Sequence, residues 1–127
     1  MIRAIGAMIA GAVAWEAVVL LATLAGRIVW PAYAEVEMQR TFALDMLLSR
    51  LAVGAVATLA FGMVVTWVAR GDKRTIRVII ALGLLYSLVD HFLVWDQFPV
   101  WYHLLYLAYI VPLALFGGRL VGRGSAQ

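Results

Sequence analysis

The chain consists of four long apolar stretches separated by short polar segments. The first stretch lies between Arg3 and Arg27 and carries one charge, Glu16. An α-helix of about 20 apolar residues, at 1.5 Å per residue, spans the roughly 30 Å hydrocarbon core of a bilayer. The pattern therefore predicts an all-α integral membrane bundle of four transmembrane helices, over about residues 4–26, 41–69, 78–95 and 100–118, forming one domain over residues 1–127.

Composition agrees with this pattern. Of the 127 residues 65% are hydrophobic and 13% are charged, whereas soluble domains are about 45–50% apolar and about 25% charged. The four stretches use almost the whole chain, which excludes an independent extramembrane catalytic domain as well as disorder and collagen. The absence of cysteine excludes disulfides, thiolate metal sites and cysteine nucleophiles.

The basic residues are distributed unequally between the two ends of the predicted helices. Seven fall on one side, and only Arg27 and Arg40 fall on the other. The seven are Arg3, Arg70, Lys73, Arg74, Arg77, Arg119 and Arg123. The positive-inside rule then predicts a multi-pass protein of the cell membrane with both termini in the cytoplasm. The net charge of +3 is accordingly interpreted as binding membrane lipid and not nucleic acid.

Ionisable side chains inside the predicted spans are the candidate functional residues, because a charge at bilayer depth is costly and usually faces the bundle interior. Counted from the cytoplasmic anchors, Glu16 and Asp90 lie at one level, about 20 Å up, and we expect Glu16 to face the interior. The predicted polar cluster of the outer half comprises Glu16, Arg50, Asp90, His91 and His103, with Tyr102 and Tyr106 as the pocket wall.

Arg50 has two interpretations. It lies at the start of a stripe with i+4 spacing, Arg50, Gly54, Thr58, Gly62 and Thr66, and stripes of small residues allow helices to approach closely. On that face the guanidinium could pair with Glu16 or Asp90. Alternatively, it could extend outward to the lipid headgroups.

No motif specifies an enzyme, a metal or a cofactor. His91, His103, Asp90 and Asp96 offer nitrogen and oxygen ligands, but their spacing is not that of a metal motif. We therefore predict neither a metal nor another cofactor. The tyrosines at helical spacing in the last stretch are interpreted chiefly as packing residues.

Two sequence segments carry a resemblance to known proteins. The chain resembles a group of small uncharacterised bacterial four-helix inner-membrane proteins in residues 95–103, Trp-Asp-Gln-Phe-Pro-Val-Trp-Tyr-His, and in residues 30–33, Trp-Pro-Ala-Tyr. This resemblance implies a location in the bacterial inner membrane but no particular activity. Size, helix count and the segment Ala14-Trp15-Glu16 are also similar to the small multidrug resistance transporters. That resemblance implies a glutamate that binds protons and cationic drugs in competition.

Three functional hypotheses follow. The favoured one is a binding or accessory protein whose outer-half polar pocket holds a small amphipathic ligand or a partner subunit. The second is a proton-coupled transporter of small solutes that uses Glu16 or Asp90. The third is a membrane enzyme with His103 and Asp90 as an acid–base pair. A homo-oligomer is compatible with all three.

Overall fold

The structure, a computed structural model, describes the backbone of residues 1–125 and the side chains of residues 1–122. It is all-α, as predicted. The elements in order are α1 (Ile2–Val29), α2 (Pro31–Glu37), α3 (Leu44–Val68), α4 (Lys73–Leu93), a 3-10 turn (Trp95–Gln97) and α5 (Val100–Ser125). Four of these helices, α1, α3, α4 and α5, are long and apolar enough to cross a membrane. The short helix α2 was not predicted.

Local chemistry accounts for the start of α4 and for the break before α5. Helix α4 begins about five residues earlier than predicted because the Asp72 carboxylate accepts hydrogen bonds from the backbone amides of Arg74 and Thr75, as at a helix N-cap. The Thr75 hydroxyl also donates to Asp72, and these bonds lower the pKa of that carboxyl. Before α5, Phe98 is extended, with φ −136° and ψ 155°, which is the conformation that the following Pro99 imposes.

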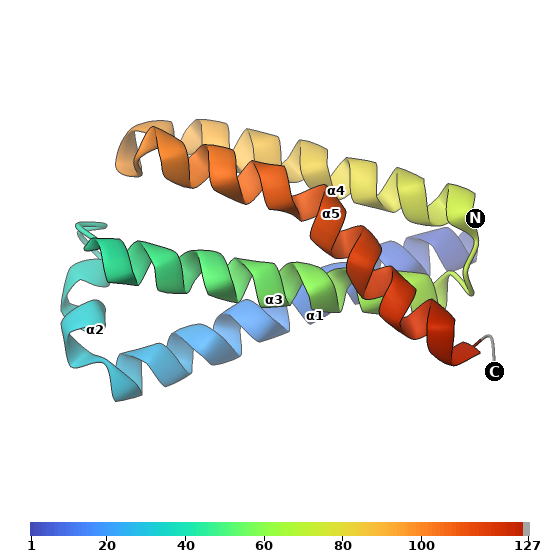
Figure 1. The fold of residues 1–127 in the computed structure, drawn as a ribbon, viewed down its shortest axis with the longest axis horizontal. Helices are drawn as coiled ribbons and strands as arrows, with labels where there is room; N and C mark the ends of the chain where they lie inside the picture. Colours follow the sequence, from blue (N-terminus) through green and yellow to red (C-terminus); the bar gives the residue numbers. More distant parts are fainter. Residues whose placement is uncertain (126–127) are drawn as a thin grey trace.

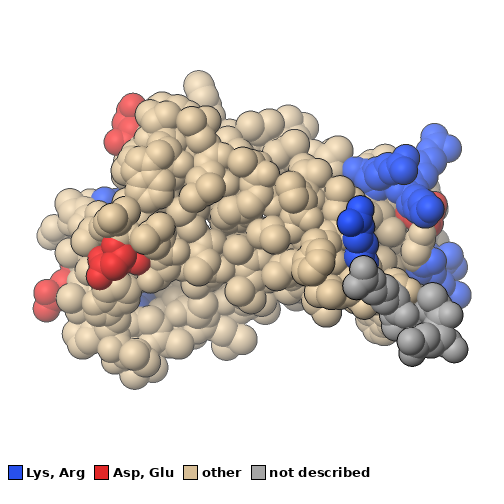
Figure 2. All heavy atoms as spheres, in the orientation of Figure 1, with Lys and Arg blue, Asp and Glu red and all other residues tan. Residues whose placement is uncertain are grey.

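The two ends of the bundle differ in charge. The N-terminus, the α3–α4 connection and the C-terminal end of α5 lie at one end, whereas α2 and the α4–α5 turn lie at the other (Figure 1). Lysine and arginine gather at the first end, which we call the basic end (Figure 2). The second end is called the aromatic end, after Trp30, Tyr33, Phe42, Trp95 and Phe98. The side chain of Arg123, which was counted with the basic group, lies outside the described residues.

Helix α3 is the centre of the bundle and packs along its length against α1 and α5, whereas α4 packs mainly against α5. The stripe predicted to face the interior does so, because Gly54, Thr58, Gly62 and Thr66 are all buried. A Cβ atom on Gly62 would lie 1.9 Å from the carbonyl oxygen of Ala114. Close backbone contact therefore joins α3 to α5.

Small residues with i+4 spacing in the first stretch, Gly6, Ala10 and Ala14, predict the packing face of α1, but the helix packs through a neighbouring stripe. Ala7 and Gly11 are buried, and a Cβ on Gly11 would meet Val65 at 2.5 Å. By contrast, nothing lies within 4 Å of a Cβ on Gly6. Helix α5 bends partway along its length (Figure 1) and contains Pro112, whose missing N–H and ring account for such a bend.

Candidate ligand-binding cavity

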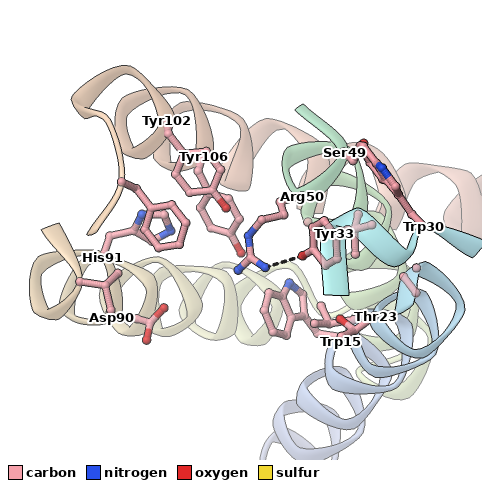
Figure 3. A pocket seen from close by; sticks show the side chains of 17 residues that line it. Trp15, Thr23, Trp30, Tyr33, Ser49, Arg50, Asp90, His91, Tyr102 and Tyr106 are labelled. Carbon is pink, nitrogen blue, oxygen red and sulfur yellow. Dashed lines mark hydrogen bonds between the residues drawn. The ribbon is translucent and has the colours of Figure 1, made fainter. Parts of the chain in front are cut away.

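Arg50 projects from the first turns of α3 at the aromatic end. Its Nη1 donates a 2.8 Å hydrogen bond to the hydroxyl oxygen of Tyr33 on α2 (Figure 3). Its guanidinium carbon lies 4.8 Å from the ring centroid of Phe42 and 5.5 Å from that of Phe98, within the range of cation–π attraction. Helix α2 and the α2–α3 connection thus supply partners for a charge carried by α3.

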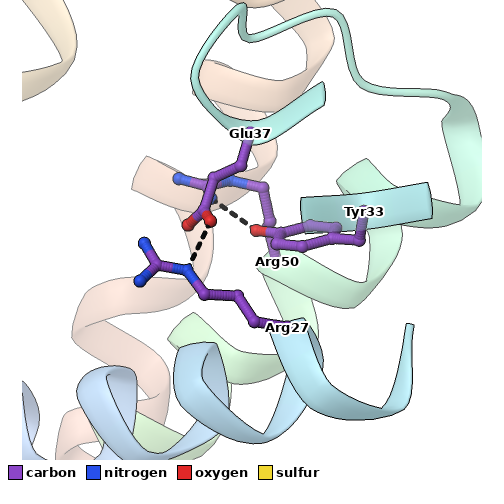
Figure 4. Close-up of polar contacts among 4 residues, drawn as sticks. All are labelled: Arg27, Tyr33, Glu37 and Arg50. Carbon is purple, nitrogen blue, oxygen red and sulfur yellow. Dashed lines mark hydrogen bonds and ion pairs between the residues drawn. The ribbon is translucent and has the colours of Figure 1, made fainter. Parts of the chain in front are cut away.

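The expected ion pair of Arg50 is absent from the described residues. The ion pair found among them joins Arg27 to Glu37 at 2.7 Å (Figure 4), so Arg50 pairs with neither Glu16 nor Asp90. The Arg50 side chain is half-buried, and its buried Nε has no hydrogen-bond partner among the described residues. Aromatic side chains hold the guanidinium instead.

A cavity of about 200 Å³ adjoins Arg50 and brings together most of the predicted cluster. Figure 3 shows Arg50 pointing toward Tyr33, with Asp90 and His91 on α4 further along the wall. The predicted residues that line this first cavity are Arg50, Asp90, His91, Tyr102 and Tyr106. Trp15, Thr23, Trp30 and Ser49 also line it and were not predicted.

A second cavity of about 430 Å³ lies between α1, α3, α4 and α5, toward the middle of the bundle. Its wall is mainly apolar and includes Phe61, Ile79 and Ile80. Glu16 lines it from α1 but is itself exposed, so its carboxylate lies at the rim. The second cavity shares four lining residues with the first, namely Trp15, Asp90, His91 and Tyr106.

The two histidines of the predicted cluster form a buried pair across the α4–α5 turn. Their Nδ1 atoms are 2.7 Å apart, and Nε2 of His103 is 3.0 Å from the carbonyl oxygen of Trp95. A carbonyl only accepts, so His103 carries its hydrogen on Nε2 and accepts at Nδ1 from the Nδ1–H of His91. Nε2 of His91 is then an acceptor. His91 lines both cavities, whereas His103 is fully buried and lines neither.

Ring stacking fixes this turn. The indole of Trp95 stacks on His103 with centroids 4.5 Å apart and planes 11° apart, and Tyr106 lies 4.4 Å from His91. Further down α5, the Tyr109 hydroxyl donates to the carbonyl oxygen of Leu51 at 2.9 Å. The tyrosines therefore pack, as expected, and Tyr102 and Tyr106 also form cavity wall.

The arrangement has the chemistry of a binding cavity. Within residues 1–122, no group of three or more His, Asp or Glu side chains could hold a metal ion. The cavity instead combines one cation, indole and phenol donors, and an adjoining apolar volume. In comparisons with known proteins, no family model, no curated protein and no solved structure matches this chain.

Proposed function

We propose that this chain is a multi-pass protein of the bacterial inner membrane that binds a small amphipathic ligand in the outer half of its bundle. The observation that carries the proposal is that the two cavities adjoin and have four lining residues in common. The first cavity, which holds the side chain of Arg50, and the second, more apolar cavity beside Phe61 share the wall formed by Trp15, Asp90, His91 and Tyr106. Such a pair suits a ligand with a polar head and an apolar tail.

The membrane orientation is part of the proposal. The α3–α4 connection and the first turns of α4, which lie at the basic end (Figure 1), carry Arg70, Lys73, Arg74 and Arg77, and such residues are enriched on the cytoplasmic side of membrane proteins. In that orientation the polar cavity lies in the outer half. A ligand reaches it from the outer leaflet, past the weakly packed side between α1 and α4, where Glu16 marks the rim.

Quenching of tryptophan fluorescence tests this function. A variant that retains Trp15 alone, with phenylalanine at the other tryptophans, is placed in lipid nanodiscs and titrated with bromoundecanol and bromoundecanoate, whose bromine quenches on contact. We expect saturable quenching, because Trp15 lines both cavities.

Two alanines of α1 provide the matched control. Both are exposed, but Ala12 lines the second cavity and Ala17 lines neither. Ala12→Phe should abolish the saturable component, and Ala17→Phe should leave it intact. Quenching that rises in proportion to probe concentration and is the same in both variants would contradict the proposal, since it would report only probe dissolved in lipid.

One observation favours a second function, a proton-coupled transporter of small solutes. Glu16 and Asp90, the two carboxylates on which such transport would depend, both line the second cavity. In proteoliposomes with an internal pH indicator, an amphipathic cation would then drive proton release that Glu16→Gln or Asp90→Asn abolishes. Glu35→Gln, at an exposed position on α2, is the control. Unchanged proton flux in both cavity variants would reject transport.

A further inference from the structure

The charge of Arg50 lacks an anionic partner among the described residues. An arginine is charged at any physiological pH and carries five N–H donors. The described groups that interact with its donors are the neutral hydroxyls of Tyr33 and Tyr102, and its buried Nε has no partner. No carboxylate among the described residues comes within 4.0 Å of it, and Glu37 is engaged by Arg27. A half-buried cation without an anionic partner is stabilised by binding an anionic ligand.

The lining of the first cavity also favours a negatively charged ligand. Besides Arg50, the cavity is lined by Trp15, Trp30 and Thr23, whose side chains carry N–H or O–H donors. The Ser49 hydroxyl, which also lines it, donates to the carbonyl oxygen of Asp45. Asp90 is the one acid that lines it, and Asp90 is exposed. The guanidinium fork matches the two oxygens of a carboxylate or a phosphate, which is why arginine binds such groups well.

The position of the second cavity specifies the rest of the ligand. It continues from the shared wall toward Phe61, Ile80 and Ile110, so an apolar chain attached to the anion can be buried there. A free inorganic anion would leave this volume unused.

From these observations, and resting on the function proposed above, we infer that the ligand is a single-chain amphiphile with an oxyanion head, a carboxylate or a phosphate ester. Its head pairs with Arg50 in the first cavity, and its tail occupies the second. Charge-assisted hydrogen bonds contribute about 1.5–3 kcal/mol each, equivalent to about tenfold or more in affinity.

The test compares probes that share a tail and differ in the head. The Trp15-only protein is titrated at mildly alkaline pH with bromoundecanoate, bromoundecanol and bromoundecyl trimethylammonium. We expect the carboxylate to bind about tenfold more tightly than the alcohol, and the ammonium to bind more weakly than both. Arg50→Gln should remove the preference for the carboxylate, whereas Arg40→Gln, at an exposed position, should preserve it.

A second variant keeps the inference testable if Arg50→Gln does not fold. Asp90→Asn removes the acid that lines both cavities and should strengthen carboxylate binding several-fold, without the same effect on the alcohol. Unchanged or weaker carboxylate binding in Asp90→Asn would overturn the inference.

The remaining outcomes separate this inference from the proposed function. If all three probes bind with equal affinity and Ala12→Phe blocks their binding, the anionic head is overturned but amphiphile binding stands. A preference for the ammonium probe has the same two consequences. Absence of saturable quenching with every probe overturns both. Competition by acetate or inorganic phosphate as effective as competition by undecanoate would indicate a free anion and reject the amphiphile.

Discussion

His91 and His103 lie with their Nδ1 atoms 2.7 Å apart, and both side chains are buried, exposed by 6% and 0%. One proton lies between the two nitrogens, donated by His91, because the other nitrogen of His103 donates to the Trp95 carbonyl. The contact joins α4 to α5 beside the cavity and positions His91 in the cavity wall.

Removing His103 should destabilise the protein strongly. In His103→Leu the Trp95 carbonyl and the Nδ1–H of His91 both lose their partners, at about 1–3 kcal/mol for each buried group left unsatisfied. Thermal unfolding in mild detergent, followed by circular dichroism, measures the loss. Leu104→Ala, at an exposed position on the same helix, is the control.

A double-mutant cycle isolates the histidine contact itself. If the two rings are coupled, His91→Leu and His103→Leu combined should cost clearly less than the sum of the single changes. Additive losses would show that the hydrogen bond contributes nothing to stability.

Close approach of α3 and α5 predicts opposite effects for two glycine-to-alanine changes. Gly62→Ala places a Cβ 1.9 Å from a backbone oxygen, so the helices must separate, at about 1–3 kcal/mol or more. Gly6→Ala meets nothing within 4 Å and should be neutral or stabilising by up to about 1 kcal/mol, because alanine is the better helix former. Equal melting temperatures for the two variants would contradict the packing of α3 on α5.

The proposed orientation predicts which loops react from outside the cell. The chain contains no cysteine, so each introduced cysteine is the sole target for a membrane-impermeant maleimide. Gln39→Cys, between α2 and α3, should react in intact cells, whereas Lys73→Cys, at the start of α4, should react only after permeabilisation. The reverse pattern would invert the topology and place the polar cavity in the inner half.

The N-cap of α4 predicts a small dependence of stability on pH. Hydrogen bonds from Thr75 and from two backbone amides lower the pKa of Asp72 in the folded protein. Their stabilisation is therefore fully present above the ordinary aspartate pKa of 3.8 and is lost as the pH falls through the lower folded value. Asp72→Asn should reduce this acid-dependent part of the melting curve, and an identical pH profile in wild type and variant would argue against the cap.

The four long helices could be predicted from the sequence because each requires about 20 consecutive apolar residues, a signal that lies within one segment. The stripe from Gly54 to Thr66 was predictable for a similar reason, since the spacing alone defines a helix face. Helix α2 is only seven residues long and leaves no such periodic signal. Its one indication is Pro31, which is favoured at the first helical position.

The partners of Arg50 could not be predicted, because all of them lie outside its own helix. Tyr33 lies 17 residues before Arg50, Phe42 lies in the connection before α3, and Phe98 lies in the connection between α4 and α5. The search for an oppositely charged partner led to Glu16 and Asp90. The aromatic rings that contact Arg50 are uncharged, so that search could not find them. Depth along the helices did place Glu16 and Asp90 at one level, since each residue advances a helix by a fixed 1.5 Å, and both line the second cavity.

Photocrosslinking shows whether an amphiphile occupies the two adjoining cavities. A fatty acid with a diazirine in its chain is irradiated with the protein in nanodiscs, and modified residues are identified by mass spectrometry. The account predicts adducts at the shared wall, at Asp90 and Trp15 above all, which excess unmodified undecanoate suppresses and Ala12→Phe prevents. Adducts confined to exposed positions outside the cavities, such as Leu20 and Leu21, and unaffected by competitor would contradict this occupancy.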